Sequence, residues 1–205
     1  MNHLNSFLSD NFQNFQLIRP IYYNWKFGLR FNLQNGEEYD EEYFGEVIKR
    51  ASDIFESAFT TEDTILLVYI DYKYKRRKIR FHNYIFEQIL NLDKNEVEYK
   101  KRKHENLIDN IAVIKVERGR IDYKNIFSVI ANKDFDRKPS LDKLGSLSGK
   151  EVYFLNIDKK LIFYMYDDRG LDIISAQVET LKPIYEKFEN WILDYDRNEI
   201  ENQFK

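Results

Sequence analysis

Residues 152–175, VYFLNIDKKLIFYMYDDRGLDIIS, decide the fold class of this 205-residue chain. Two apolar runs, 152–157 and 161–166, are separated only by the tripeptide DKK, and this spacing predicts a β-hairpin. The sequence DDRG then turns the chain into a third short run, 171–175. Consecutive strands joined by turns this short predict an antiparallel sheet.

The rest of the chain adds further strands to this sheet. Residues 27–33 alternate apolar with polar or small side chains and predict a half-buried strand. Residues 64–72, TILLVYIDY, are continuously apolar and predict an interior strand that is buried on both faces. Residues 112–116 alternate as another strand, and the charged stretch 93–105 is interpreted as a loop or an edge hairpin.

Helical spacing of apolar residues separates these strands. It predicts a short N-terminal helix over 3–15, a closing helix over 177–195, and helices over 43–59, 79–92 and 123–131. No Pro/Gly/Ser-rich linker divides the chain. We therefore expect an α+β fold in one domain spanning 1–205, with a mixed, mostly antiparallel sheet packed against several helices.

Composition excludes several classes of function. The chain has no cysteine and three histidines, so disulfides, thiolate metal sites and cysteine nucleophiles are excluded, and a histidine metal cluster is disfavoured. No apolar run approaches the ~18 residues of a membrane span, and the first ten residues lack the pattern of a secretory signal. We expect a cytoplasmic protein with no membrane partner, no cofactor and no metal.

Basic residues concentrate in one part of the chain. Residues 71–120 hold 14 Lys and Arg against 8 Asp and Glu, although the whole chain has a net charge of −3. Such segments are able to bind a phosphate backbone, but a solvated, lysine-protected sheet edge is the favoured interpretation. The candidate nucleic-acid-binding residues are Lys73, Lys75, Arg76, Arg77, Lys78, Arg80, Lys100, Lys101, Arg102 and Lys103.

The heptapeptide YDDRGLD, residues 166–172, is the most distinctive motif. Its three carboxylates have the oxygen chemistry that Mg²⁺ prefers, but a permanent positive charge among them disfavours a metal. The favoured interpretation is a tight turn with capping aspartates and a glycine at positive φ, and a strand arginine is expected to pair with one aspartate. The candidate cluster is Arg30, Asp167, Asp168, Arg169, Gly170 and Asp172.

Four stretches of the chain form a recognisable set: YNWKFGLRF at 23–31, Arg50-Ala51 with Ile54-Phe55-Glu56 and Phe59, YDDRGLD at 166–172, and WILDYD at 191–196. Together they resemble a bacterial family catalogued as domain of unknown function 3885. The resemblance covers about Phe12 to Phe204 and is weakest over 73–103. It implies a small, single-domain, cytoplasmic bacterial protein and no established reaction or cofactor.

Because Walker, dinucleotide-binding and serine-hydrolase motifs are absent, an enzyme is the less favoured class and no catalytic residue is assigned. The leading hypothesis is a non-catalytic protein-interaction module, with an immunity- or antitoxin-like role among its forms. Nucleic-acid binding through 73–80 and 100–103 is the first alternative. A metal-dependent hydrolase at Asp167, Asp168 and Asp172 is the second. The oligomeric state stays open.

Overall fold

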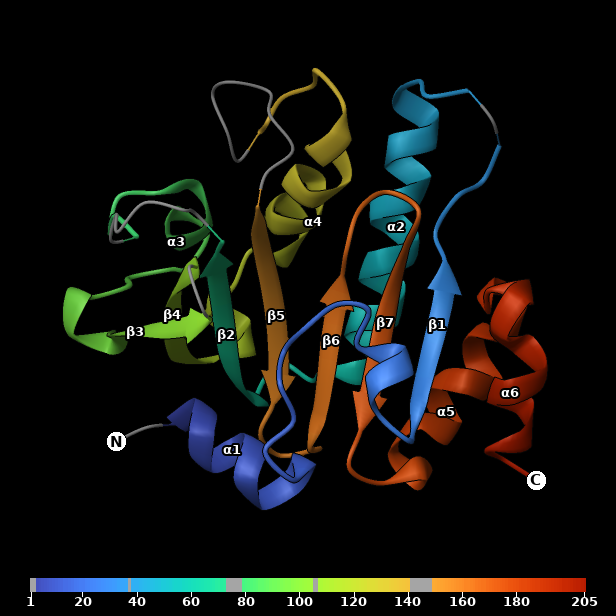
Figure 1. Cartoon of the computed structure of the whole chain (residues 1–205). Coiled ribbons are helices and arrows are strands. Elements are labelled where there is room, and N and C mark those ends of the chain that lie inside the picture. Colours follow the sequence, from blue (N-terminus) through green and yellow to red (C-terminus); the bar gives the residue numbers. More distant parts are fainter. Residues whose placement is uncertain (1–2, 37, 73–78, 105–106, 141–148) are drawn as a thin grey trace.

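The strands form one open, twisted sheet (Figure 1). A computed structural model describes residues 3–36, 38–72, 79–104, 107–140 and 149–205. Within these residues the sheet has seven strands in the order β1-β7-β6-β5-β2-β4-β3, and every described pairing is antiparallel. The predicted α+β fold with a mostly antiparallel sheet is confirmed.

The strands and helices have the following bounds. The strands are β1 Gly28–Asn32, β2 Thr64–Asp71, β3 Val97–His104, β4 Leu107–Glu117, β5 Lys150–Asn156, β6 Leu161–Met165 and β7 Gly170–Ser175. The helices are α1 His3–Phe12, α2 Glu41–Ala58, α3 Tyr84–Glu87, α4 Tyr123–Ala131, α5 Val178–Phe188 and α6 Arg197–Asn202. Among the described residues, no helix has the length and apolarity that crossing a bilayer requires.

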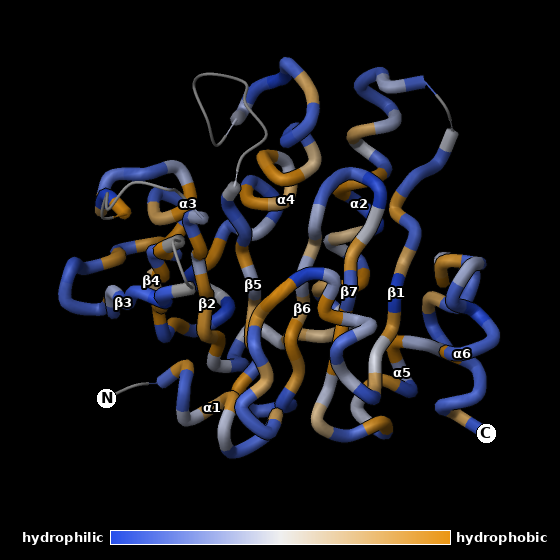
Figure 2. Tube along the Cα trace, in the orientation of Figure 1, coloured by the Kyte–Doolittle hydropathy of each residue, from blue (hydrophilic) through white to orange (hydrophobic). Residues whose placement is uncertain are grey.

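Each face of the sheet is covered by a different layer, as Figure 1 shows. One face lies under α2, α4 and α5, and its core is centred on Phe55, whose ring stacks on Phe59 at 4.3 Å and packs edge-on against Phe154 and Phe163. Figure 2 shows hydrophobic residues along β2 and mainly hydrophilic ones along β3 at the sheet edge. The expected burial of β2 on both faces is confirmed, because alternate residues belong to the two cores.

The second face lies under α1 and the chain that follows it. Residues 17–23, here called the N-terminal strap, cross the sheet from the β3 side toward β1 (Figure 1). Leu17 and Ile21 of the strap are buried against apolar side chains of the inner strands. The strap therefore completes a core that the ten-residue helix α1 covers only in part.

Two predicted helices end earlier than the apolar spacing suggested. The N-terminal helix stops at Phe12 rather than residue 15, because Gln13 and Asn14 adopt positive φ. Over 79–92 only Tyr84–Glu87 is helical. There, Ile89 forms a β-bridge with Ile121, and this contact with a distant segment draws the backbone out of the helix.

The closing helix is also shorter than the sequence predicted. It ends at Phe188, where two short 3-10 turns and α6 replace the continuous helix expected to reach residue 195. Ile192 forms a bridge with Phe31, and the Leu193 amide donates to the Arg30 carbonyl at 2.9 Å. Because these residues pair with the edge of β1, they are not available for helical hydrogen bonds. Tyr195, the last residue of the predicted helix, is exposed.

A glycine is required at position 170 because there is no room for a side chain, not because the backbone has a positive φ. The predicted positive φ is wrong, since among the described glycines only Gly36 has one. A Cβ at position 170 would lie 2.2 Å from the Tyr166 hydroxyl and 2.5 Å from the Phe31 carbonyl oxygen. The backbones of β7 and β1 thus approach too closely here for any side chain.

We expect Gly170→Ala to lower the free energy of unfolding by about 2–3 kcal/mol, because a strand carbonyl has no room to move away. The matched control is Gly45→Ala in α2, where the new Cβ meets nothing within 4 Å. This control should stabilise the protein by about 0.5–1 kcal/mol. Urea unfolding of the two variants measures both effects, and equal effects would contradict the close approach at Gly170.

Candidate functional site

The acidic motif forms the turn between β6 and β7. The Tyr166 amide donates to the Gly170 carbonyl at 3.2 Å and closes the turn. Asp167 accepts from the backbone amide of Arg169 at 2.9 Å, and from its Nε at 3.0 Å. The Arg169 carbonyl in turn accepts from the Leu33 amide at 2.9 Å. The turn is therefore fixed internally and attached to the chain leaving β1.

Asp168 fastens this turn to α2. It is buried, and its Oδ2 accepts from the Tyr43 hydroxyl at 2.6 Å. The Tyr43 hydroxyl also accepts from Gln34 Nε2 at 3.1 Å. Burial raises the pKa of Asp168, while the Tyr43 hydrogen bond opposes that change. This contact joins residues 125 positions apart, so the motif helps to place the first turn of α2.

Asp172 lies on the opposite side of the motif, under the N-terminal strap. Its Oδ1 accepts from Arg30 Nε at 2.9 Å, as expected for a lone strand arginine, and its Oδ2 accepts from the Tyr22 amide at 3.3 Å. Arg30 Nη1 also lies 3.8 Å from Asp196, which accepts from the Tyr23 hydroxyl at 2.9 Å. The strap, β1, β7 and the C-terminal segment thus meet at one partly buried guanidinium.

This cluster carries two carboxylates for one guanidinium. Burial raises the pKa of Asp172 to about 6, against the lowering effect of Arg30, and the nearby Asp196 adds to the rise. The Arg30 guanidinium is sandwiched among aromatic rings and lies 4.7 Å from the centroid of Tyr23. The cluster is a structural junction with a carboxylate that is costly to ionise.

The three motif aspartates therefore do not share one site. Asp167 pairs with Arg169, Asp168 with Tyr43, and Asp172 with Arg30. Across the parts of the chain that the structure describes, no group of three or more His, Cys, Asp or Glu side chains is arranged to hold a metal ion. The geometry agrees with the turn interpretation and gives the metal-dependent hydrolase hypothesis no support.

Sequence reasoning missed a second polar cluster on the same face of the sheet. Buried Glu151 of β5 accepts from the Tyr72 hydroxyl at 2.6 Å and from the Tyr153 hydroxyl, and it pairs with Arg19 of the strap at 3.2 Å. Tyr153 stacks on Tyr164 of β6, which lies opposite Asp172 in the sheet register. Glu151 is one of 35 acidic residues, and no motif distinguishes it.

The second basic segment is divided between the two faces of β3. Lys100 and Arg102 lie opposite Ile111 and Asp109 on the face of the strap, and alternation places Lys101 and Lys103 on the other face. Arg102 pairs with Asp109 at 2.9 Å and Lys100 with Glu98 at 3.5 Å. A single strip of four adjacent cations is thus not formed.

In the first basic segment, Arg80 is exposed. The candidates Lys73, Lys75, Arg76, Arg77 and Lys78 lie outside the described residues. Nucleic-acid binding through these two segments stays a prediction.

Exposed and half-buried arginine and aromatic side chains gather next to the β6–β7 turn, and we call them the motif-edge patch. Arg169 is 62% exposed at its side chain, and Tyr39 is 56% exposed. The Tyr39 ring lies 5.0 Å from that of Phe135 and 5.1 Å from that of Tyr43, the residue bound to Asp168. The patch consists of Tyr39, Phe135, Arg137 and Arg169.

Comparison with known proteins finds the family that the YDDRGLD motif and the three other quoted stretches resemble. The sequence profile described as "Domain of unknown function (DUF3885)" matches residues 4–196. A curated relative, "Uncharacterized protein YnaE" of Bacillus subtilis (strain 168), is 28% identical over 212 residues, which cover 94% of this chain and 98% of the relative. No solved structure matches the chain.

The raised pKa of Asp172 predicts that the stability of the fold depends on pH. A carboxyl whose pKa is higher in the folded than in the unfolded chain lowers stability as pH rises from about 4, its unfolded value, to about 6. Asp172→Asn should therefore match wild type near pH 4 and gain on the order of 2–3 kcal/mol relative to it by pH 7.

Chemical unfolding of both proteins at several pH values measures this difference. Asp194→Asn, in which an exposed carboxylate is neutralised, is the control for the loss of one negative charge. If wild type instead becomes more stable than Asp172→Asn as pH rises, the attraction between Arg30 and the Asp172 carboxylate outweighs the cost of burying that carboxylate.

Proposed function

The chain belongs to the family described as "Domain of unknown function (DUF3885)", and we propose that it acts as a non-catalytic protein-interaction module. The observation that carries the proposal is the use the fold makes of the YDDRGLD motif. Its aspartates bind Arg169, Tyr43 and Arg30 within the protein. The side chain it presents to solvent is Arg169, which Asp167 holds in place.

The motif-edge patch has the residue types that dominate protein interfaces. Arginine and tyrosine are enriched among residues that contribute most to binding, since each offers a large contact area and directional hydrogen bonds. In this patch Arg137 lies 4.1 Å from the ring centroid of Phe44 and pairs with Glu41 at 2.7 Å, so its guanidinium is already oriented. Preorganised side chains lose less entropy on binding.

The patch is also rigidly supported. It lies over the Asp168–Tyr43 hydrogen bond and the aromatic contacts of Tyr39 and Phe44 with Phe135. Three segments that are distant in sequence therefore present one surface. An immunity- or antitoxin-like role, in which this surface covers the active region of a partner protein, is one form of the proposed function.

A photo-crosslinking amino acid at position 39, in the protein expressed in its own host, tests the proposal. We expect one protein to be captured in stoichiometric amount at position 39 and not at position 90, where Leu90 is 64% exposed and lies outside the patch. Arg169→Ala should reduce the capture at least about tenfold, the loss of one charge-assisted contact.

Thermal unfolding of Arg169→Ala provides the folding control, because the substitution also removes a partner of the buried Asp167 carboxylate. Capture at position 39 no stronger than at position 90, or capture unaffected by Arg169→Ala in a folded protein, would contradict the proposed surface.

A further inference from the structure

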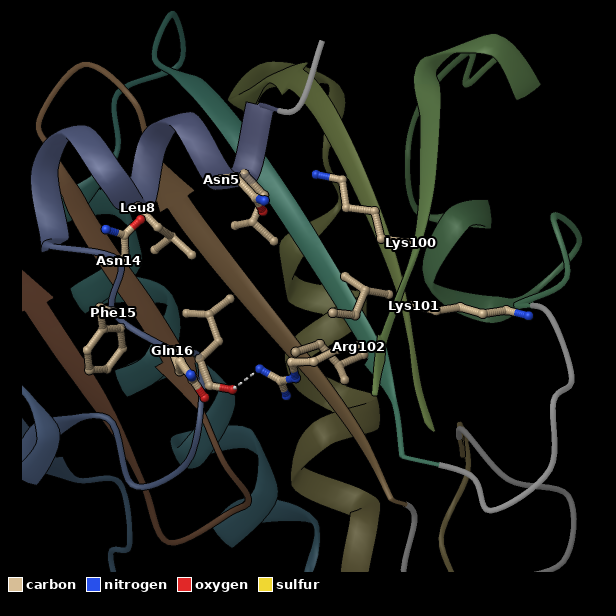
Figure 3. A pocket seen from close by; sticks show the side chains of 12 residues that line it. Asn5, Leu8, Asn14, Phe15, Gln16, Lys100, Lys101 and Arg102 are labelled. Carbon is tan, nitrogen blue, oxygen red and sulfur yellow. Dashed lines mark hydrogen bonds between the residues drawn. The ribbon is translucent and has the colours of Figure 1, made fainter. Parts of the chain in front are cut away.

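A cleft opens on the strap side of the sheet, between α1 and the β3–β4 edge. Its volume is about 620 Å³, within the range of small-molecule sites. Figure 3 shows α1 and residues 14–16 along one wall and β3 along the other. The cleft lies apart from the motif-edge patch, since β6 and β7 belong to the other half of the sheet.

The lining combines an apolar part with cationic side chains. Leu8, Phe15 and Ile111 are among its apolar members, and none of the described residues that line it is acidic. Lys100 and Arg102 point toward α1 and the residues that follow it, whereas Lys101 points away (Figure 3). The cleft is lined by Leu4, Asn5, Leu8, Asn14, Phe15, Gln16, Leu17, Ile70, Lys100, Lys101, Arg102 and Ile111.

The two cations of the cleft differ in how they are held. Arg102 is fixed by Asp109 and by the Leu17 carbonyl, which its Nη1 approaches at 3.5 Å. Lys100 shares Glu98 with His3, whose Nε2 lies 3.4 Å from the other carboxylate oxygen. Burial lowers the pKa of Lys100, and the nearby Glu98 carboxylate opposes that change.

We propose that this cleft binds a small amphipathic anion, with its acidic headgroup at Lys100 and Arg102 and its apolar body against Leu8, Phe15 and Ile111. A bound anion adds charge-assisted hydrogen bonds to a partly desolvated ammonium group. The apolar lining favours a ligand with a hydrocarbon or aromatic body, because such a body removes the apolar side chains from water. A bare inorganic anion would leave them exposed to water. Carboxylate and phosphate headgroups share this chemistry.

Titration of the full-length protein with octanoate and with octyl phosphate, followed by amide chemical shifts, tests the proposal. We expect saturable shifts at Leu8, Phe15, Lys100 and Arg102 with at least one of the two. The tighter of them identifies the headgroup. Octanamide, which has no charge, and acetate, which has no apolar body, should bind at least about tenfold more weakly.

Matched variants separate this site from general electrostatic attraction. Lys100→Met should weaken binding of the anion about tenfold and leave octanamide unaffected. Lys103→Met removes the same charge from the other face of β3 and should change nothing. Leu8→Trp should abolish binding by filling the apolar part, and its melting temperature reports whether the fold is retained.

Equal binding of octanoate, octyl phosphate and octanamide would overturn the proposal. Equal losses in Lys100→Met and Lys103→Met would also overturn it, as would shifts confined to residues outside the cleft.

Discussion

The buried Arg30–Asp172 pair is the contact on which most of this structure depends. It joins neighbouring residues of β1 and β7, which face each other in the sheet register, and it lies beneath the N-terminal strap. Asp172 is fully buried, so its charge is stabilised only by partners within the protein. Such a pair contributes little net stability, but removing Arg30 leaves the Asp172 carboxylate as an uncompensated buried charge. The position of every segment that contacts the pair is thereby restricted.

The same principle extends across the sheet. Polar side chains on the strap side of the strands receive partners from the strap, with Arg19 at Glu151, the Tyr22 amide at Asp172 and the Leu17 carbonyl at Arg102. An unpartnered buried polar group costs about 1–3 kcal/mol, so the strap has a defined register on the sheet rather than a merely apolar contact. Because the carboxylates of the YDDRGLD motif bind partners within the protein, the motif stabilises the fold. The proposed binding surfaces use other side chains.

Local sequence was sufficient for elements whose stability is local. The β5–β6–β7 meander, α2 and α4 follow from hydrophobic periodicity and short turns, and Asp40 caps α2 by accepting from the Tyr43 amide. Predictions were wrong where a distant segment competes for the backbone. Ile89 pairs with Ile121, and Ile192 pairs with Phe31, and neither contact is visible in a helical pattern. The positive φ predicted for Gly170 was wrong because the constraint comes from the Phe31 carbonyl of another strand.

The candidate site shows the same division. The sequence indicated that Arg30 required a carboxylate and offered three, but only the register of β1 with β7 selects Asp172, 142 residues away. Tyr43 and Glu151 were missed because their partners lie in other elements. The motif-edge patch and the cleft each combine segments that are distant in sequence, so no local pattern predicts them.

A double-mutant cycle of Arg30→Met and Asp172→Asn at pH 7, read out by urea unfolding, tests the central claim most directly. Arg30→Met alone should cost roughly 3–5 kcal/mol. Adding Asp172→Asn should then restore clearly more than the about 2–3 kcal/mol that Asp172→Asn gains in the wild-type background, because without Arg30 the buried Asp172 charge is more costly. Hydrogen exchange at the Tyr22 amide should accelerate in Arg30→Met, as the strap loosens. Additive effects of the two substitutions, with unchanged exchange at Tyr22, would contradict this account.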